Sequence, residues 1–216
     1  MASHFFKNSF PTMPSPEIVI IDFDDSFTYN IANSFDEFCK IDPIVLHWKK
    51  VRHEQQRLLM DCKIIVWGPG PGHPSEYEEI VPIMHKTFAS QKIFNLGICL
   101  GHQLYWKMVG GQILPSREAL HGESIDITIP PWAIFPRDFH HQVTKVQRYN
   151  SLCVKKNLIC QARQTQQDLI MDGEVIMSAG PNFLTMQFHP ESIGTSCPRL
   201  FFAVAEQFRY NHRNES

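Results

Sequence analysis

The sequence predicts a single-domain α/β fold with a mostly parallel central sheet, helices on both faces, and extra antiparallel strands in its second half. Three observations predict it. Apolar runs of strand length alternate with helical patterns on short connections through the first half. The second half carries several strand patterns in close succession. The chain has 216 residues, enough for one sizeable core, and neither a linker nor a repeat interrupts residues 17–212.

Residues 1–16, MASHFFKNSFPTMPSP, are expected to form a flexible extension ahead of the domain at 17–212. They lack the charged start and the long apolar stretch of a secretory signal. The six cysteines include no C-x-x-C pair, so reduced thiols and a cytoplasmic location are expected. The formal net charge is −2 and no apolar run is long enough to span a bilayer, so the composition favours neither nucleic acid nor a membrane as a partner.

The first half is expected to alternate strands and helices. Strands are predicted at 17–23, 43–48, 63–67 and 91–98. Helices are predicted over 26–40, 52–60 and 101–111, and after a capping box of Ser75 and Glu78, with Pro82 leaving the start of that last helix open. The helix at 26–40 has an apolar stripe that consists of Phe27, Ile31, Phe35 and Phe38.

The second half is expected to add further strands and a closing helix. Strands are predicted at 125–130, 151–156, 169–177 and 184–189. The stretch 169–177 is expected to fold back on itself at Asp172-Gly173, a dipeptide that favours a two-residue hairpin turn. The closing helix, over 198–210, is expected to turn inward the side chains of Leu200, Phe201, Val204, Ala205 and Phe208.

Cys99 is predicted to be a nucleophile because of the turn on which it lies. In GICLGHQ (97–103) it separates a strand from a helix, with Gly97 and Gly101 two positions away on either side. A sharp strand-to-helix turn crowds the backbone, and these glycines remove side chains that would collide. The turn lifts the sulfur above the carboxyl ends of the strands, and the start of the helix favours the thiolate. The alternative for this motif alone is a small buried hydrophobic residue.

The loop GPGPGHP (68–74) follows the third strand and is expected to point backbone amides at a substrate carbonyl. One of these amides and the amide of Leu100 are predicted to form an oxyanion hole. A phosphate-binding loop is excluded, because the Gly-Lys-Ser/Thr ending is missing and the three prolines lack amide donors. A rigid connector is the alternative for this segment in isolation.

The segment QFHPES (187–192) is predicted to supply a general base and its orienting group. Pro190 is expected to hold His189 extended, so that His189 and Glu191 point to the same side of the chain. The imidazole can then accept a proton while the carboxylate stabilises the imidazolium. His121, His140 and His141 show no pattern of metal ligands, so no metal site is predicted.

The motifs GICLGHQ, GPGPGHP and QFHPES together resemble those of the class I (triad) glutamine amidotransferases. The opening IVIIDFDDSFTYNIAN, with its DSFTYN, resembles in particular the subunits that serve anthranilate synthase and aminodeoxychorismate synthase. The resemblance covers residues 17–210 and implies the flavodoxin-like fold of that family, as well as a catalytic triad of Cys99, His189 and Glu191. It also implies a glutamine and oxyanion site that consists of Gly70, Pro71, Gly72, Leu100, Gln103, Ser151 and Leu152.

The resemblance implies hydrolysis of L-glutamine to glutamate and ammonia, without a metal or organic cofactor, and delivery of the ammonia to a synthase subunit that aminates chorismate. Anthranilate synthase component II is the favoured identity. Aminodeoxychorismate synthase component II, or service to both enzymes, is the alternative. A cysteine hydrolase with another substrate is disfavoured by Gln103 and DSFTYN. A regulatory partner without catalysis is disfavoured by the intact triad.

Three positions depart from the pattern of the family. Gly68 stands where the family usually has Ser, and Glu123 stands where it usually has the Lys of His-Gly-Lys. Asn150 replaces the usual His of Arg-Tyr-His-Ser-Leu. Because the triad is untouched, the chemistry is expected to be retained, and the departures bear on partner docking and on the efficiency of glutamine use.

Overall fold

The computed structural model of the chain describes residues 16–52, 55–117, 119, 121–156 and 165–213. Apart from its last residue, the expected extension at 1–16 lies outside the described residues. In chain order the elements are β1 (Ile18–Asp22), α1 (Thr28–Cys39), β2 (Ile44–His47), the 3₁₀ helix η1 (Trp48–Arg52), α2 (Gln56–Asp61), β3 (Ile64–Trp67), the 3₁₀ helix η2 (Pro74–Ile80), α3 (Val81–Ala89), β4 (Phe94–Ile98), α4 (Leu100–Met108), β5 (Gln112–Pro115), β6 (Glu123–Thr128), the 3₁₀ helix η3 (Arg137–Phe139), β7 (Val143–Arg148), β8 (Leu152–Lys155), β9 (Gln167–Met171), β10 (Glu174–Gly180), β11 (Phe183–Met186) and α5 (Pro198–Arg213).

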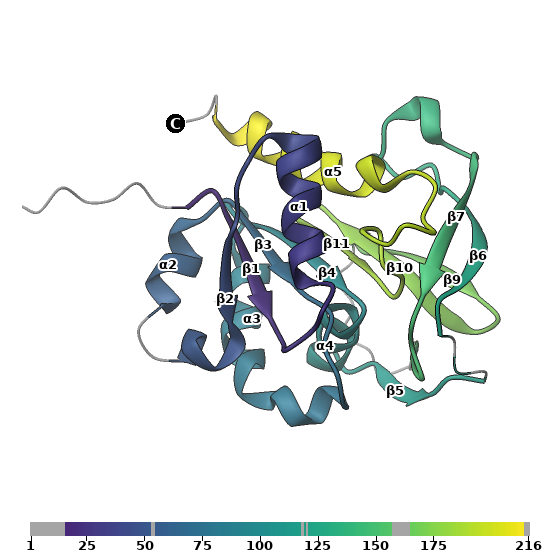
Figure 1. Cartoon of the computed structure of the whole chain (residues 1–216), viewed down its shortest axis with the longest axis horizontal. Helices are drawn as coiled ribbons and strands as arrows, with labels where there is room; N and C mark the ends of the chain where they lie inside the picture. Colours follow the sequence, from purple (N-terminus) through teal and green to yellow (C-terminus); the bar gives the residue numbers. More distant parts are fainter. Residues whose placement is uncertain (1–15, 53–54, 118, 120, 157–164, 214–216) are drawn as a thin grey trace, which may run out of the picture.

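A seven-stranded sheet with the order β2-β1-β3-β4-β11-β10-β9 forms the centre of the molecule (Figure 1). Strands β2, β1, β3, β4 and β11 run parallel, whereas β10 and β9 extend the sheet in antiparallel pairing. The first five positions follow the doubly wound order of flavodoxin-like folds. The predicted fold class is confirmed: a mostly parallel sheet with antiparallel strands from the second half of the chain.

Two apolar cores pack against the two faces of this sheet. Ile18 and Ile20 of β1 point into the core formed with α1 and α5, whereas Val19 and Ile21 point into the core formed with α2, α3 and α4. The same alternation continues along β3. Strands that bury both faces need continuous apolar runs, which is why IVII and IIVW carry no polar residue. Figure 1 shows α1 and α5 together on one side of the sheet.

Two strands were not predicted, and both belong to small antiparallel ribbons outside the main sheet. The two strands are β5 and β7. β7 pairs with the predicted strand β6, and β5 pairs with the predicted strand β8. In VTKVQR, the sequence of β7, apolar and long polar side chains mix, and only alternate residues are buried. Such a ribbon gives a much weaker sequence signal than a core strand, because one of its faces stays in water.

Several local predictions are corrected by the structure. The expected helix over 52–60 is confirmed in its second part as the short helix α2, whereas Arg52 ends the 3₁₀ helix η1. The capping box before α3 involves His73 and Glu76, not Ser75 and Glu78: Glu76 Oε1 accepts from the amide of His73 at 2.6 Å. The imidazole of His73 accepts from the amide of Ser75, a role that the usual Ser/Thr-first pattern does not anticipate.

The hairpin prediction at Asp172-Gly173 is confirmed. Both residues have positive φ, 51° and 77°, as a type I′ turn requires, and the turn joins β9 to β10.

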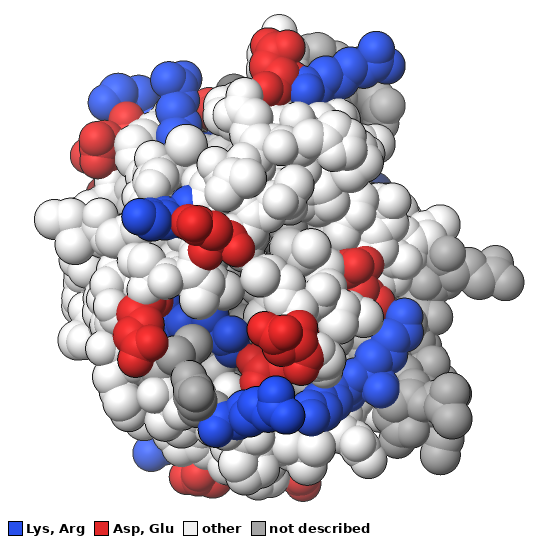
Figure 2. Space-filling view, turned by 90° about the vertical axis from the view of Figure 1, so that its right-hand side faces the viewer, with Lys and Arg blue, Asp and Glu red and all other residues white. Residues whose placement is uncertain are grey.

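Among the described helices, none combines the length and apolar character that crossing a bilayer requires. Figure 2 shows both basic and acidic side chains on the face turned toward the viewer, with a run of basic side chains along its lower part and acidic side chains beside it.

Candidate active site

Cys99 lies on the sharp turn between β4 and α4, as the sequence predicted. Its backbone has φ 51° and ψ −100°, a conformation rarely adopted by a residue with a side chain. The amide of Cys99 donates to the carbonyl of Met186 at 2.9 Å, which ties the turn to the end of β11. The residue is 8% exposed, so the sulfur sits just beneath the surface at the carboxyl ends of the parallel strands.

Close approach of β3 makes glycine necessary at the start of α4. A Cβ at Gly101 would lie 2.1 Å from the carbonyl oxygen of Trp67, well inside any allowed contact. The amide of Gly101 donates to the carbonyl of Gly68 at 3.2 Å, so the nucleophile turn and the loop after β3 are held together. The predicted reason for the glycines around Cys99, crowding of the backbone, is therefore confirmed.

The loop 68–74 packs against the same turn. A Cβ at Gly70 would meet the side chain of Leu100 at 2.5 Å and that of Phe23 at 2.6 Å. Gly70, in the loop expected to supply one oxyanion-hole amide, and Leu100, expected to supply the other, are thus neighbours in space. At Gly68, where the resemblance leads one to expect Ser, a Cβ would lie 2.7 Å from the carbonyl oxygen of Ile21. The close passage of β1 therefore leaves no room for a side chain at this position.

His189 and Glu191 form a buried pair directly beside Cys99. Nδ1 of His189 lies 2.7 Å from Oε1 of Glu191, and the two side chains are 3% and 0% exposed. The predicted route to this pair is wrong in one respect. His189 is extended as predicted, since it forms an antiparallel bridge with Gln147. The chain does not stay extended to Glu191: the amide of Ser192 donates to the carbonyl of His189 at 3.2 Å, so residues 189–192 form a β-turn with Pro190 in its second position.

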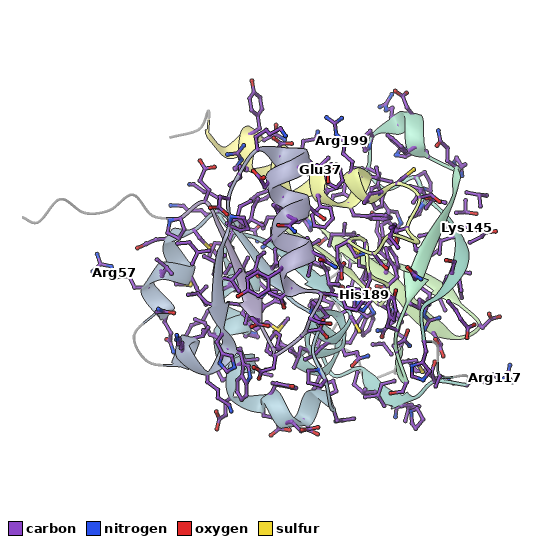
Figure 3. All side chains as sticks on the ribbon, in the orientation of Figure 1. Glu37, Arg57, Arg117, Lys145, His189 and Arg199 are labelled. Carbon is purple, nitrogen blue, oxygen red and sulfur yellow. The ribbon has the colours of Figure 1, made fainter. Side chains whose placement is uncertain are left out.

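The surroundings of His189 favour its protonated form. Burial alone would lower the pKa of the imidazole, but the Cys99 sulfur and the Glu191 carboxylate outweigh burial and raise that pKa well above its usual value. Nε2, the nitrogen opposite the carboxylate, is buried; among the described residues it forms no hydrogen bond of regular geometry, and the Cys99 sulfur is its electrostatic partner. This nitrogen is therefore available to a substrate. Figure 3 shows His189 in the interior, near the first turn of α1.

Two aromatic rings hold the imidazole in place. The ring centroids of Phe27 and Tyr149 each lie 5.1 Å from that of His189. The hydroxyl of Tyr149 also lies 3.1 Å from Oγ of Ser192, in the β-turn that carries the histidine. Phe27 belongs to the DSFTYN motif, so this motif contributes to the site through a ring contact. The sequence analysis did not assign either aromatic residue to the site.

The residues expected to bind glutamine fall into two groups. Gln103 donates through Nε2 to the carbonyl of Leu152 at 3.3 Å, which joins α4 to the start of β8 close to Cys99. Gly70 contacts Leu100, as above. The Pro71 carbonyl accepts from the Tyr77 hydroxyl, and the Ser151 carbonyl accepts from the amide of Ser116. At Gly72, a Cβ would lie 2.5 Å from the carboxylate of Glu76.

Gln187 is a site residue that the sequence analysis missed, although it begins the quoted QFHPES segment. Its side chain is fully buried, and its Nε2 lies 3.6 Å from the sulfur of Cys99. Its Oε1 accepts from Nε2 of Gln103 at 3.1 Å. The contact joins residues far apart in the sequence, so only the glutamine immediately before a buried Phe-His pair could have drawn attention to it.

Other titratable residues near the turn have structural roles. His102 is fully buried, and burial lowers its pKa to about 4; Nδ1 lies 3.0 Å from the Thr185 hydroxyl and Nε2 lies 2.9 Å from the Val175 carbonyl. This histidine is therefore neutral and bridges α4 to the sheet. The described cysteines Cys39, Cys62, Cys99, Cys153 and Cys197 are all unpaired; Cys160 lies outside the described residues.

Two cavities lie away from the nucleophile. One, of about 330 Å³, lies between α5 and the strands β4 and β10, with Phe94 and Phe208 in its wall. The other, of about 450 Å³, is lined by Arg148 and Glu174 together with Glu123 and Asp172. In the described residues, no three His, Cys, Asp or Glu side chains gather in a way that could hold a metal ion.

Comparisons with known proteins identify the family of the chain. The model of the family described as "Glutamine amidotransferase class-I" matches residues 19–206. The chain is 32% identical over 197 residues to "Anthranilate synthase component 2, pyocyanine specific" of Pseudomonas aeruginosa, a match that covers 83% of this chain and 87% of that protein. It is 31% identical over 186 residues to "Aminodeoxychorismate synthase" of Streptomyces pristinaespiralis, covering 85% of this chain but 25% of that longer protein. A solved glutamine amidotransferase from Thermotoga maritima has the same fold, with a TM-score of 0.63 at 15% identity over 93% of this chain and 85% of that one.

Proposed function

The chain belongs to the class-I glutamine amidotransferase family, and on that premise we propose that Cys99, His189 and Glu191 form a triad that hydrolyses the side-chain amide of L-glutamine. The single observation that carries the proposal is the buried His189–Glu191 pair, 2.7 Å apart, beside a cysteine on a strained strand-to-helix turn. Nucleophile, base and orienting group thereby meet from two distant parts of the chain, as covalent catalysis by a triad requires.

In the first half of the reaction, the Cys99 thiolate attacks the amide carbon and forms a carbon–sulfur bond. Because the pKa of His189 is raised well above its usual value, the imidazole carries a proton beside the sulfur of Cys99. Collapse of the tetrahedral intermediate breaks the carbon–nitrogen bond, and Nε2 gives its proton to the departing amide nitrogen, which leaves as ammonia. Glu191 stabilises the imidazolium before that transfer and fixes the ring so that Nε2 faces the reacting atoms.

In the second half, water hydrolyses the thioester. Neutral His189 takes a proton from the attacking water, glutamate leaves, and the sulfur returns to its thiolate. The amides of Leu100 and Gly70 are proposed to stabilise the oxyanion in both halves, which the contact between these two residues supports. Pro71, Gly72, Gln103, Ser151 and Leu152 are proposed to complete the glutamine site.

The acceptor of the ammonia is proposed to be a separate synthase subunit that aminates chorismate. The names of the relatives support this class of partner, since they include both an anthranilate synthase component 2 and an aminodeoxychorismate synthase. Anthranilate is the favoured product and aminodeoxychorismate the alternative. A cytoplasmic location is proposed because the described cysteines are unpaired, as in a reducing compartment.

The test uses the chain together with the synthase subunit that co-purifies with it. Cys99→Ala is expected to abolish glutamate release and glutamine-dependent product formation, while product formation with added ammonium salt continues, because only the ammonia supply is lost. Cys197→Ala, at a half-buried cysteine, is the matched control and should keep both activities. Fluorescent anthranilate among the products would identify the favoured branch.

Each other outcome points to an alternative. Glutaminase activity retained by Cys99→Ala rejects the triad. A wild-type chain that binds its partner but releases no glutamate supports a regulatory role without catalysis. Cys99 labelling by a peptide electrophile, but not by an electrophilic glutamine analogue, supports another cysteine hydrolase.

A further inference from the structure

We propose that the side-chain amide of Gln187 is a hydrogen-bond donor to the sulfur of Cys99, and that a relay from the buried Arg148–Glu174 ion pair holds it in that orientation. The inference rests on the proposed function, in which Cys99 is the nucleophile, and it concerns how the thiolate form of Cys99 is stabilised. It adds Gln187 to the groups that touch the reacting atoms. Arg148, Glu174 and Asn150 become positioning residues.

The end of the relay at the nucleophile consists of two side-chain amides. Gln187 Nε2 lies 3.6 Å from Cys99 Sγ, within hydrogen-bond range for sulfur, and Gln187 Oε1 accepts from Gln103 Nε2 at 3.1 Å. Gln103 Nε2 also donates to the Leu152 carbonyl at 3.3 Å. A carbonyl oxygen can only accept, so Gln103 must turn its NH₂ group toward Leu152. The oxygen of Gln187 must then face Gln103, and its NH₂ must face the sulfur.

The far end of the relay is fixed by charge. Arg148 can only donate, and it donates from one terminal nitrogen to Glu174 Oε2 at 2.7 Å and from Nε to Asn150 Oδ1 at 3.0 Å. Asn150 must therefore present Nδ2 to the Leu152 carbonyl, which it does at 2.9 Å. The Leu152 carbonyl accepts from both Asn150 and Gln103. The bond from Asn150 fixes the position of this carbonyl, and the orientation of Gln103 and then of Gln187 depends on it.

The ion pair is rigid enough to serve as this anchor. Arg148 and Glu174 are 6% and 8% exposed, and Ser116 donates to the second carboxylate oxygen at 2.9 Å. Burial alone would raise the pKa of Glu174, but the hydrogen bonds from Arg148 and Ser116 outweigh burial and lower it, so the carboxylate stays charged. The pair joins β7 to β10 and stands at the wall of the cavity of about 450 Å³.

A donor at the sulfur favours the thiolate, because the thiolate accepts a hydrogen bond more strongly than the thiol. Among the described residues, His189, which pairs with Glu191, is a titratable group that also interacts with Cys99. On α4 the first titratable side chain is His102, which is neutral and bonded to Thr185 and Val175. On the loop after β3, His73 bonds to Ser75. Gln187 is the uncharged group that stabilises the Cys99 thiolate, in addition to His189.

The test measures how alkylation of Cys99 by iodoacetamide depends on pH in the full chain. The sulfur displaces iodide only as thiolate, and mass spectrometry follows the tryptic peptide 93–107, in which Cys99 is the only cysteine. Gln187→Met removes the donor without adding charge. We expect the midpoint of its alkylation profile to move to higher pH by about one unit, the weight of one hydrogen bond to a charged acceptor.

Asn150→Asp is the second variant, and it leaves Cys99 and Gln187 untouched. It keeps the acceptor for Arg148 but turns an oxygen toward the Leu152 carbonyl, so the relay is broken at a distance. The midpoint is expected to move in the same direction by a smaller amount, and the KM for glutamine to rise. Gln112→Met, on the exposed face of β5, is the matched control and should leave the profile unchanged.

An unchanged midpoint in a Gln187→Met variant with a wild-type circular dichroism spectrum overturns the proposal. Where that variant does not fold, an unchanged midpoint in Asn150→Asp overturns it instead. Glutamate release by the wild-type chain is measured in the same preparation. A shifted profile without any wild-type glutaminase rejects the proposed function and leaves the relay standing, whereas glutaminase with unshifted profiles rejects the relay alone.

Discussion

Two buried histidines near the Cys99 turn respond to burial in opposite ways, and their partners decide the outcome. His102 has a hydroxyl and a carbonyl as partners, so burial prevails and lowers its pKa to about 4. His189 has a carboxylate and the Cys99 sulfur, which overcome burial and raise its pKa. A buried imidazole is charged only where a negative partner compensates the lost hydration. The same residue type therefore bridges α4 to the sheet in one place and serves the proposed chemistry in the other.

The neutral state of His102 predicts an acid-sensitive stability. Between its folded pKa of about 4 and the usual value of 6.5, the unfolded chain binds a proton there that the folded chain does not. Stability therefore falls as pH drops through this window, by about 3 kcal/mol in total. Urea unfolding at pH 7 and pH 4.5 measures the loss.

His102→Gln provides the comparison, because an amide can still donate to the Val175 carbonyl and accept from Thr185. The variant is expected to be less stable than the wild type at pH 7, owing to imperfect packing, but to lose less stability on acidification. An equal loss in both proteins would contradict the role given to His102, since other groups would then account for the acid sensitivity.

At the scale of elements, the contact between α4 and β3 sets the position of Cys99. The first turn of α4 passes so close to Trp67 that a Cβ at Gly101 would lie 2.1 Å from its carbonyl oxygen. Backbone cannot move aside as a side chain can, so Gly101→Ala must push the helix away from the strand. We expect a loss of stability of about 3 kcal/mol or more and a loss of glutaminase activity, measured by urea unfolding and glutamate release.

Gly110→Ala separates this clash from the general cost of replacing glycine. Gly110 follows α4 with φ +87°, and a Cβ there would meet nothing within 4 Å. Its replacement by Ala is expected to lower the free energy of unfolding by about 1–2 kcal/mol, the cost of a left-handed backbone for a residue with a Cβ, and to leave Cys99 in place. If Gly101→Ala cost no more than Gly110→Ala and kept its activity, the close contact between α4 and β3 would not position the nucleophile.

The elements that the sequence predicted well are those in which one physical requirement dominates. β1, β3 and β4 are buried on both faces, so their apolar runs are unambiguous. The glycine at position 101 was predictable because any side chain there would collide with backbone. β5 and β7 were missed because their half-exposed ribbons have mixed patterns. Gln187 was missed for a different reason: its role arises only when β11 brings it to Gln103 and Cys99, and no local pattern encodes that contact.

At the scale of the whole molecule, the sheet separates two apolar cores that must form together if residues 17–212 are one domain. Cys39 belongs to the core under α1 and α5, and Cys62 belongs to the core on the opposite face. Burial, with Glu206 nearby, raises the pKa of Cys39 to about 12, and burial raises that of Cys62 to about 12 as well. Cys153 in β8 is also buried, and burial and Glu174 raise its pKa to about 11.

These three thiols predict a test of the single domain. In the native state at pH 8 they should resist iodoacetamide, because they are buried and protonated, whereas in the unfolded chain each has an ordinary thiol pKa. As urea is increased, the three tryptic peptides that contain them (8–40, 58–63 and 149–155) should become labelled at one common midpoint, since breaking either core exposes the shared sheet. Cys99, whose thiolate is proposed to be active in the folded protein, should be labelled before any urea is added. Separate midpoints for Cys39 and Cys62 would show that the two faces unfold independently, and the range 17–212 would then contain more than one cooperative unit.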